Sequence, residues 1–187
     1  VKNELQHHEE AIKDFTEAIK IDPKECDSYI NRGFAKYDKK DYQEAIKDFN
    51  KAIKEANKQG AFVFWNHPHW ESQRRDGIAR LDPIHKEIIN KNYLHGIEVV
   101  NMSTFSEEAL QIALENDLTI MGTSDVHVLI DWDFNNEKES YHRPLTFIIS
   151  ENRTLKSTSD ALFKGDTFIW YPVSYTHLTL PTRCLVG

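Results

Sequence analysis

The stretch AFVFWNHPHW, at Ala61–Trp70, decides the fold of this 187-residue chain, because the sequence pattern changes there. Its first five residues form a continuous apolar run, which is typical of a buried β-strand. The segment before it is helical and repetitive, whereas the segment after it alternates apolar runs with helical patterns. These patterns predict an α/β fold class in which a helical part precedes a sheet.

An internal repeat marks the N-terminal segment. The sequence AIKDF occurs at Ala11–Phe15 and again at Ala45–Phe49, and AIK occurs at Ala18–Lys20 and Ala52–Lys54. Both pairs are offset by 34 residues, which is the period of the tetratricopeptide repeat, a helix–turn–helix unit. The segment resembles about one and a half such repeats.

Three helices are expected here, near residues 9–21, 26–39 and 42–57. The small side chains of Ala45 and Ala52 let neighbouring helices approach each other. Isolated repeats of this number rarely fold alone, because stacked neighbours supply their core. We interpret the segment as a structural piece, with binding of a protein partner through its helices as the alternative.

From Ala61 onward, strands alternate with helices. The expected strands are 61–65, 96–100, 118–122, 145–149 and 167–171, and the expected helices are 83–92, 107–116 and 155–164. Asp82 and Ser106 are the predicted N-caps, and Gly165 ends the last helix. This alternation implies right-handed crossovers and a parallel sheet or barrel arc. Functional residues in such folds gather at the C-terminal ends of the strands.

Composition excludes several classes of partner. The formal net charge of -7 argues against a nucleic-acid or anionic-membrane surface. No apolar run approaches the roughly 20 residues of a membrane-spanning helix. Because no secretory signal is visible, we expect a soluble, cytoplasmic protein by default.

Three side chains with metal-ligand chemistry follow two of the predicted strands. His67 comes after the first strand, and Asp125 and His127 lie in TSDVH at Thr123–His127. Two imidazoles and one carboxylate suit a divalent metal such as Zn²⁺, Mn²⁺ or Fe²⁺. In an extended segment, residues two apart lie on the same side, so Asp125 and His127 can reach one metal region. A loop histidine, a turn aspartate and a surface histidine are the structural alternatives.

The order of these motifs resembles the PHP (polymerase and histidinol phosphatase) phosphoesterases, and most closely a branch of PHP-type phosphodiesterases. The elements that carry the resemblance are QGAFVFWNHPHW, HGIEVVN, GTSDVH and HRPLTF, at 59–70, 95–101, 122–127 and 142–147. It covers roughly residues 55–171.

This resemblance implies a partial, distorted β/α barrel that acts on a phosphate ester. Bound metals would activate water and neutralise charge on the phosphoryl group. His67, Asp125 and His127 are the implied metal ligands, with Asp125 also assigned to catalysis. Arg143 is the candidate for holding a phosphate oxygen, and a surface-loop arginine is the alternative.

Three further residues are left open, and a fourth has a structural expectation. His69 stands where the family usually has glycine, so its imidazole either enters the site or points outward. Glu98 and Asn101, near the end of a predicted strand, face either the pocket or the sheet edge. His85 is expected to be a solvated or loop residue.

The early metal ligands of the family are missing. No H-x-H pair occurs before Ala61, where repeat sequence stands instead. We therefore expect a truncated phosphoesterase with weak metal binding and at best feeble activity; the alternative is an interaction protein with a non-catalytic α/β part.

The expected domains are 1–56, 57–171 and 172–187. The junction between the first two is interpreted as a chimera, with natural fusion as the alternative. The sequence VSYTHLTLPT, at Val173–Thr182, resembles one translated frame of a sequencing adapter, so the last domain is interpreted as a tail derived from it.

Overall fold

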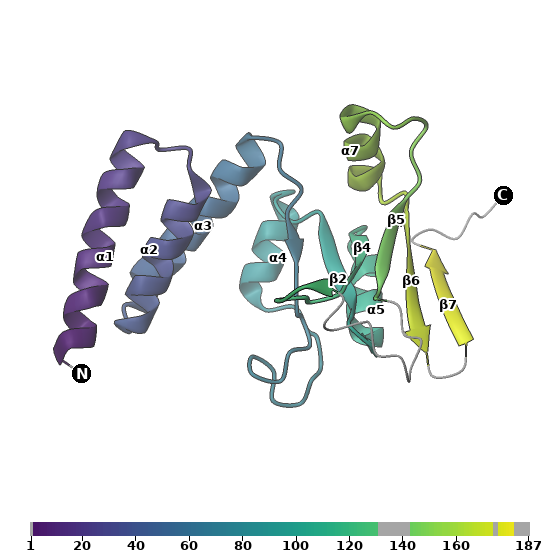
Figure 1. Ribbon diagram of the computed structural model, residues 1–187, viewed down its shortest axis with the longest axis horizontal. Coiled ribbons are helices and arrows are strands. Elements are labelled where there is room, and N and C mark those ends of the chain that lie inside the picture. The colour runs from purple at the N-terminus through teal and green to yellow at the C-terminus, as the bar shows by residue number, and fades with distance from the viewer. Residues whose placement is uncertain (1, 131–142, 174–175, 182–187) are drawn as a thin grey trace. The chain divides into compact units, whose positions relative to one another are not determined.

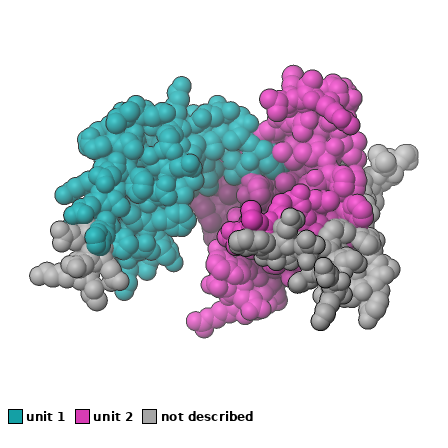
Figure 2. Space-filling model, viewed as in Figure 1, with its two compact units in different colours: residues 1–63 teal, residues 64–187 magenta. Residues whose placement is uncertain are grey.

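The computed structural model describes residues 2–130, 143–173 and 176–181. The chain divides into two compact units, Val1–Val63 and Phe64–Gly187 (Figure 2). The first unit consists of helices, and the second contains strands and helices (Figure 1). The mixed α/β class predicted from the sequence is therefore confirmed. The domain limits of 1–56, 57–171 and 172–187 stay predictions.

The helical unit contains three successive helices, as expected. They are α1 (Lys2–Ile21), α2 (Cys26–Asp38) and α3 (Tyr42–Lys58). The side chain of Glu25 caps α2 by accepting hydrogen bonds from the backbone N–H groups of Asp27 and Ser28. Helix α1 starts earlier than the expected residue 9, because the residues before it are good helix formers that carry no apolar periodicity.

Small residues let α2 and α3 pack closely. Ala45 and Ala52 are buried on α3. A side-chain carbon at Gly33 would lie only 2.6 Å from the ring of Phe49, so glycine is the residue that admits this ring. Phe49 also packs edge-on against Phe34, with 5.3 Å between ring centroids. The close approach that the repeat pattern predicts is present.

A buried carboxylate ties the three helices together. Asp48 accepts hydrogen bonds from Arg32 Nε at 2.8 Å and from Lys36 Nζ at 2.7 Å. The same Arg32 donates to Thr16 Oγ1 on α1 at 3.1 Å. Burial raises the pKa of Asp48, but the bonds from Arg32 and Lys36 outweigh it and hold this pKa below its ordinary value.

The variant Asp48→Ala should lower the free energy of unfolding of the helical unit by about 3 kcal/mol, because it leaves two partly buried cations unpaired. Urea unfolding followed by far-UV circular dichroism measures this. Asp14 is the matched control, since it holds the same place in the first AIKDF and is exposed. Asp14→Ala should change stability by no more than about 0.5 kcal/mol, and equal losses in both variants would contradict the role of Asp48.

Acid should weaken the same ion pair. Because the folded-state pKa of Asp48 is lowered, its contribution is complete above the ordinary aspartate pKa and is lost as the pH falls through the folded-state value. Stability should therefore decline more steeply in acid for the unmodified chain than for Asp48→Asn.

The first sheet of the α/β unit is mainly parallel. Strands β1 (Phe64–Trp65) and β4 (Thr119–Thr123) both pair in parallel with β2 (Gly96–Asn101). The short β3 (Thr104–Phe105) pairs with β2 in antiparallel. Helices α4 (Pro83–Asn90) and α5 (Glu107–Glu115) form the crossovers. The expected βαβ pattern is confirmed in this part, with Ile97, Val99, Val100 and Ile120 in its core.

The expectation of a parallel arrangement is wrong for the last strands. β5 (Leu145–Ile148), β6 (Thr167–Val173) and β7 (Thr176–Pro181) form a second sheet in which neighbours are antiparallel. Gly165, in the left-handed region at φ 74°, reverses the chain after helix α7 (Leu155–Lys164). The returning Asp166 then accepts a backbone hydrogen bond from Ile149 at 2.8 Å. β6 therefore runs back beside β5.

β4 also packs against the second sheet. Thr146 on β5 accepts from the backbone N–H of Gly122 at 2.8 Å and donates to its carbonyl at 2.9 Å. A side-chain carbon at Gly122 would lie 2.5 Å from Ile169 on β6. Glycine is therefore the residue that lets these strands approach, immediately before the segment that carries Asp125.

Candidate functional site

A pocket of about 440 Å³ lies where β1, β2 and β4 end. All three metal ligands implied by the resemblance line it. The complete lining consists of His67, His69, Trp70, Glu71, Gly77, Asn101, Thr104, Asp125 and His127. The parallel strands thus bring together motifs that are far apart in the sequence.

Two of the candidate ligands stand on strained backbone. His67 and Asp125 have positive φ angles of 52° and 50°, in the left-handed region that ordinary residues rarely adopt. Such conformations persist only where surrounding contacts hold them, and they cluster at functional sites. For His67, one such contact is the 2.6 Å hydrogen bond from its backbone N–H to Glu98.

The side chains of His67 and Asp125 face each other. His67 Nε2 lies 3.3 Å from Asp125 Oδ1, and both side chains are about one-third exposed. His127 lies nearby but is directed differently: its Nδ1 is 2.7 Å from the backbone carbonyl of Asp125, and its side chain is 82% exposed. The structure therefore pairs two of the three candidates and leaves the third at the rim.

The His67–Asp125 pair fits a divalent metal. Ligand bonds of roughly 2.0–2.2 Å allow two donors of one ion to lie 3.3 Å apart. His69 Nδ1, in the same pocket wall, is buried and has no hydrogen-bond partner within the described part of the chain. Among those residues, no group of three or more histidine, cysteine or acidic side chains is arranged to hold a metal. The described residues therefore provide two metal ligands that fit one ion, but not a full set of ligands.

Arg143 is not among the described residues that line this pocket. It is exposed and precedes β5. The structure therefore does not bring Arg143 together with the three candidate ligands. The neighbouring His142 lies outside the described residues.

The sequence left the place of Glu98 open, and the structure puts it beneath the pocket. Glu98 is completely buried, and its two oxygens contact His67, Asn101 and Thr123. Asn101 reaches the pocket itself. The available sequence signal was a carboxylate inside the apolar run GIEVV, where burial demands hydrogen-bond partners.

His85 is half-buried rather than solvated, which corrects the expectation. Its ring stacks on Trp65 with 3.9 Å between centroids, and its Nδ1 accepts a hydrogen bond from the backbone N–H of Asp82 at 3.0 Å. Burial lowers the pKa of His85, although Asp82 opposes the shift. The neutral ring supports the strand that ends two residues before His67.

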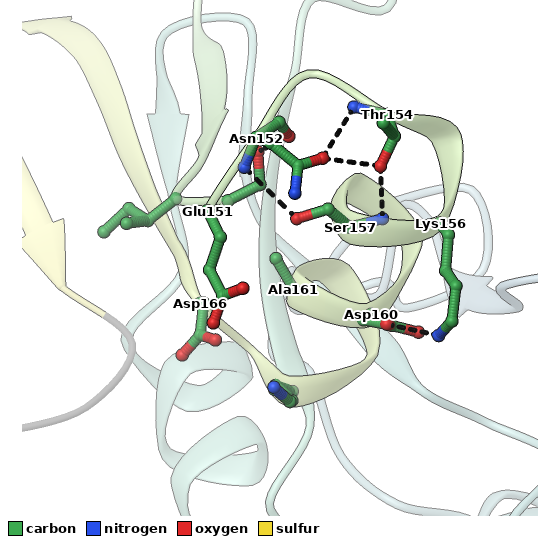
Figure 3. A pocket seen from close by; sticks show the side chains of 11 residues that line it. Glu151, Asn152, Thr154, Lys156, Ser157, Asp160, Ala161 and Asp166 are labelled. Atoms are coloured by element: carbon green, nitrogen blue, oxygen red, sulfur yellow. Dashed lines mark hydrogen bonds and ion pairs between the residues drawn. The ribbon is translucent and has the colours of Figure 1, made fainter.

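A second pocket, of about 250 Å³, lies at the start of α7 (Figure 3). Several of its polar groups bond to one another. Asn152 accepts from the backbone N–H and hydroxyl of Thr154, and Thr154 accepts from the backbone N–H of Ser157. These bonds cap the helix and satisfy part of the polar lining. The other pocket brings candidate metal ligands together, so it remains the better candidate for chemistry.

Comparison with known proteins adds two findings. Tetratricopeptide repeat models match residues 1–25 and 26–57, so the chain contains these repeats. The chain is also similar to the crystal structure of a two-domain protein from Bacteroides vulgatus ATCC 8482 that contains a predicted PHP-like metal-dependent phosphoesterase. That similarity has 40% identity and a TM-score of 0.62, over 66% of this chain and 35% of the other.

The chain thus spans about one-third of the length of that structure. No curated protein matches the present chain. Within the described residues, no helix is both long and apolar enough to cross a membrane. The class supported by fold and comparison is a tetratricopeptide segment joined to an α/β part similar to a PHP-like structure.

Proposed function

We propose that the α/β unit is part of a metal-dependent phosphoesterase domain of PHP type, and that it acts on phosphodiesters. The observation that carries this proposal is the His67–Asp125 pair, with 3.3 Å between the facing atoms at the ends of two parallel strands. The 40% identity to a structure described as containing a PHP-like phosphoesterase supports it.

The three candidate metal ligands and Arg143 each have a role in this proposal. His67, Asp125 and His127 would hold a divalent ion of zinc, manganese or iron. When bound, the ion supplies a polarised water and positive charge for the phosphoryl group. Asp125 would also orient that water, and Arg143, which does not line the pocket, would hold a phosphate oxygen.

Activity in this chain should be weak. The described residues provide a donor pair rather than a full set, and the H-x-H pair of the family does not occur before Ala61. A metal held by few ligands binds weakly and lacks the fixed geometry that phosphoryl transfer requires.

The variant Asp125→Ala should abolish hydrolysis of bis(p-nitrophenyl) phosphate that depends on Mn²⁺ or Zn²⁺, and should weaken binding of the metal. Even the hydrogen-bond partners of metal ligands contribute about 10–100-fold to affinity, so loss of a direct ligand costs at least as much. Isothermal titration and product release measure the two effects.

Asp160→Ala is the matched control, because Asp160 lies on α7, outside the His67–Asp125 pocket. It should leave metal binding and hydrolysis unchanged. Turnover that needs no metal, or activity that survives Asp125→Ala, would contradict the proposed function.

We also propose that the helical unit binds a protein partner. The tetratricopeptide matches support this role, and so do two aromatic side chains on α2, since Phe34 and Tyr37 are each more than half exposed. Tyr29, by contrast, is buried and donates its hydroxyl to the carbonyl of Pro23. Tyr29 therefore contributes to stability rather than to a binding surface.

The double variant Phe34→Ala/Tyr37→Ala should reduce capture of a partner by the immobilised chain about tenfold, which corresponds to roughly 1.4 kcal/mol. Quantitative mass spectrometry of captured proteins measures the ratio. Tyr29→Phe is the control, because it keeps the buried ring and should bind normally. A capture profile unchanged in the double variant would count against this role.

We further propose that the junction between residues 1–56 and 57–171 is a chimera and that the tail at 172–187 derives from a sequencing adapter. The ten-residue match at Val173–Thr182 supports the second point. Sequencing of unamplified source DNA across codons 45–70 and 165–187 should fail to find at least one junction. Single reads that cross both junctions would establish a continuous gene and refute the proposal.

A further inference from the structure

Glu98 is a fully buried carboxylate surrounded by hydrogen-bond donors. Its Oε2 accepts the backbone N–H of His67 at 2.6 Å and lies 3.0 Å from Nδ1 of the same residue. Its Oε1 accepts from Asn101 Nδ2 at 3.2 Å and from the hydroxyl of Thr123. A carboxylate taken out of water costs several kcal/mol unless such donors compensate it.

The tautomer of His67 follows from this arrangement. Nδ1 lies between Glu98 Oε2 at 3.0 Å and Asn101 Nδ2 at 2.9 Å. The buried carboxylate is a stronger hydrogen-bond acceptor than the neutral imidazole. It faces Nδ1 whether the Asn101 amide donates to His67 or to Glu98. If Nδ1 carried no proton, its lone pair would face the lone pairs of Glu98 Oε2 in a buried site, which is repulsive. The proton therefore belongs on Nδ1, and the Asn101 amide donates to Glu98 Oε1.

A proton on Nδ1 leaves the lone pair of Nε2 directed toward Asp125. Nε2 and Asp125 Oδ1 are then two acceptors at 3.3 Å. Two acceptors at this distance repel each other unless a proton or a metal ion lies between them, and imidazole nitrogen and carboxylate oxygen are both ligands that a divalent ion takes. One oxygen of Glu98 also holds the backbone N–H of His67, whose φ is 52°. The carboxylate thus fixes both the ring and the turn that carries it.

We propose that Glu98 is the positioning residue of this pocket, which keeps the proton of His67 on Nδ1 and presents Nε2 to a divalent ion. The proposal deepens the proposed function and rests on it for the identity of the ligand. Carboxylates that orient metal-bound histidines in this way are a general feature of metal sites. Asn101 and Thr123 hold the carboxylate from β2 and β4.

The first test is NMR of the nitrogen-labelled imidazole of His67 in the metal-free full chain at mildly alkaline pH. The expected result is a proton on Nδ1. A bare Nδ1 with the proton on Nε2 would overturn the proposal. This measurement needs no variant, so it stands even if substitution of the buried Glu98 prevents folding.

The second test is metal affinity in Glu98→Gln, measured by titration with Zn²⁺ or Mn²⁺ alone. The neutral amide is a weaker acceptor than the carboxylate and has only one oxygen, so the preference for a proton on Nδ1 should weaken and the affinity should fall about 10–100-fold. Asp160→Ala is the matched control, since Asp160 lies on α7 outside the pocket and its loss leaves Glu98 and both His67 contacts in place. It should keep the Nδ1 proton and most of the affinity.

The outcomes separate the two proposals. Unchanged tautomer and affinity in a folded Glu98→Gln variant would refute the role of Glu98. A protonated Nδ1 in an unmodified chain that binds no metal would refute the proposed function, and would leave Glu98 as the group that sets the tautomer of His67.

Discussion

The buried carboxylate of Glu98 connects three strand ends of the α/β unit. It accepts hydrogen bonds from the turn after β1, from Asn101 at the end of β2 and from Thr123 at the end of β4. Because an uncompensated carboxylate in this position would destabilise the fold, the three strand ends must keep their register. The pocket exists where this register places His67 opposite Asp125.

The helical unit also contains a buried carboxylate that needs compensating partners, but here the partners are cationic side chains. Asp48 is buried among α1, α2 and α3 and is neutralised by Arg32 and Lys36. A buried charge with full partners specifies one arrangement of helices, since any other arrangement would leave it unpaired. In one unit the buried carboxylate joins helices, and in the other it supports a candidate site.

Much of the local structure was predictable from the sequence. The helices at α2, α3 and α7 lie where apolar periodicity and caps indicated, and His67, Asp125 and His127 do line one pocket. The direction of β6 was predicted wrongly, because alternation of strands and helices favours parallel pairing but does not fix the direction in which a returning strand pairs. The backbone bond between Ile149 and Asp166, made after the turn at Gly165, decides it.

The sequence by itself determined the repeat period, the class of the α/β segment and the chemistry of the metal-ligand candidates, because these depend on residue types at short spacing. Only the tertiary structure decided that His67 pairs with Asp125, that His127 faces solvent and that Glu98 lies beneath His67. These contacts join residues 31 positions apart or more, or depend on a side-chain direction. Strand pairing sets the long-range contacts and burial sets the side-chain directions. A local sequence pattern encodes neither strand pairing nor burial.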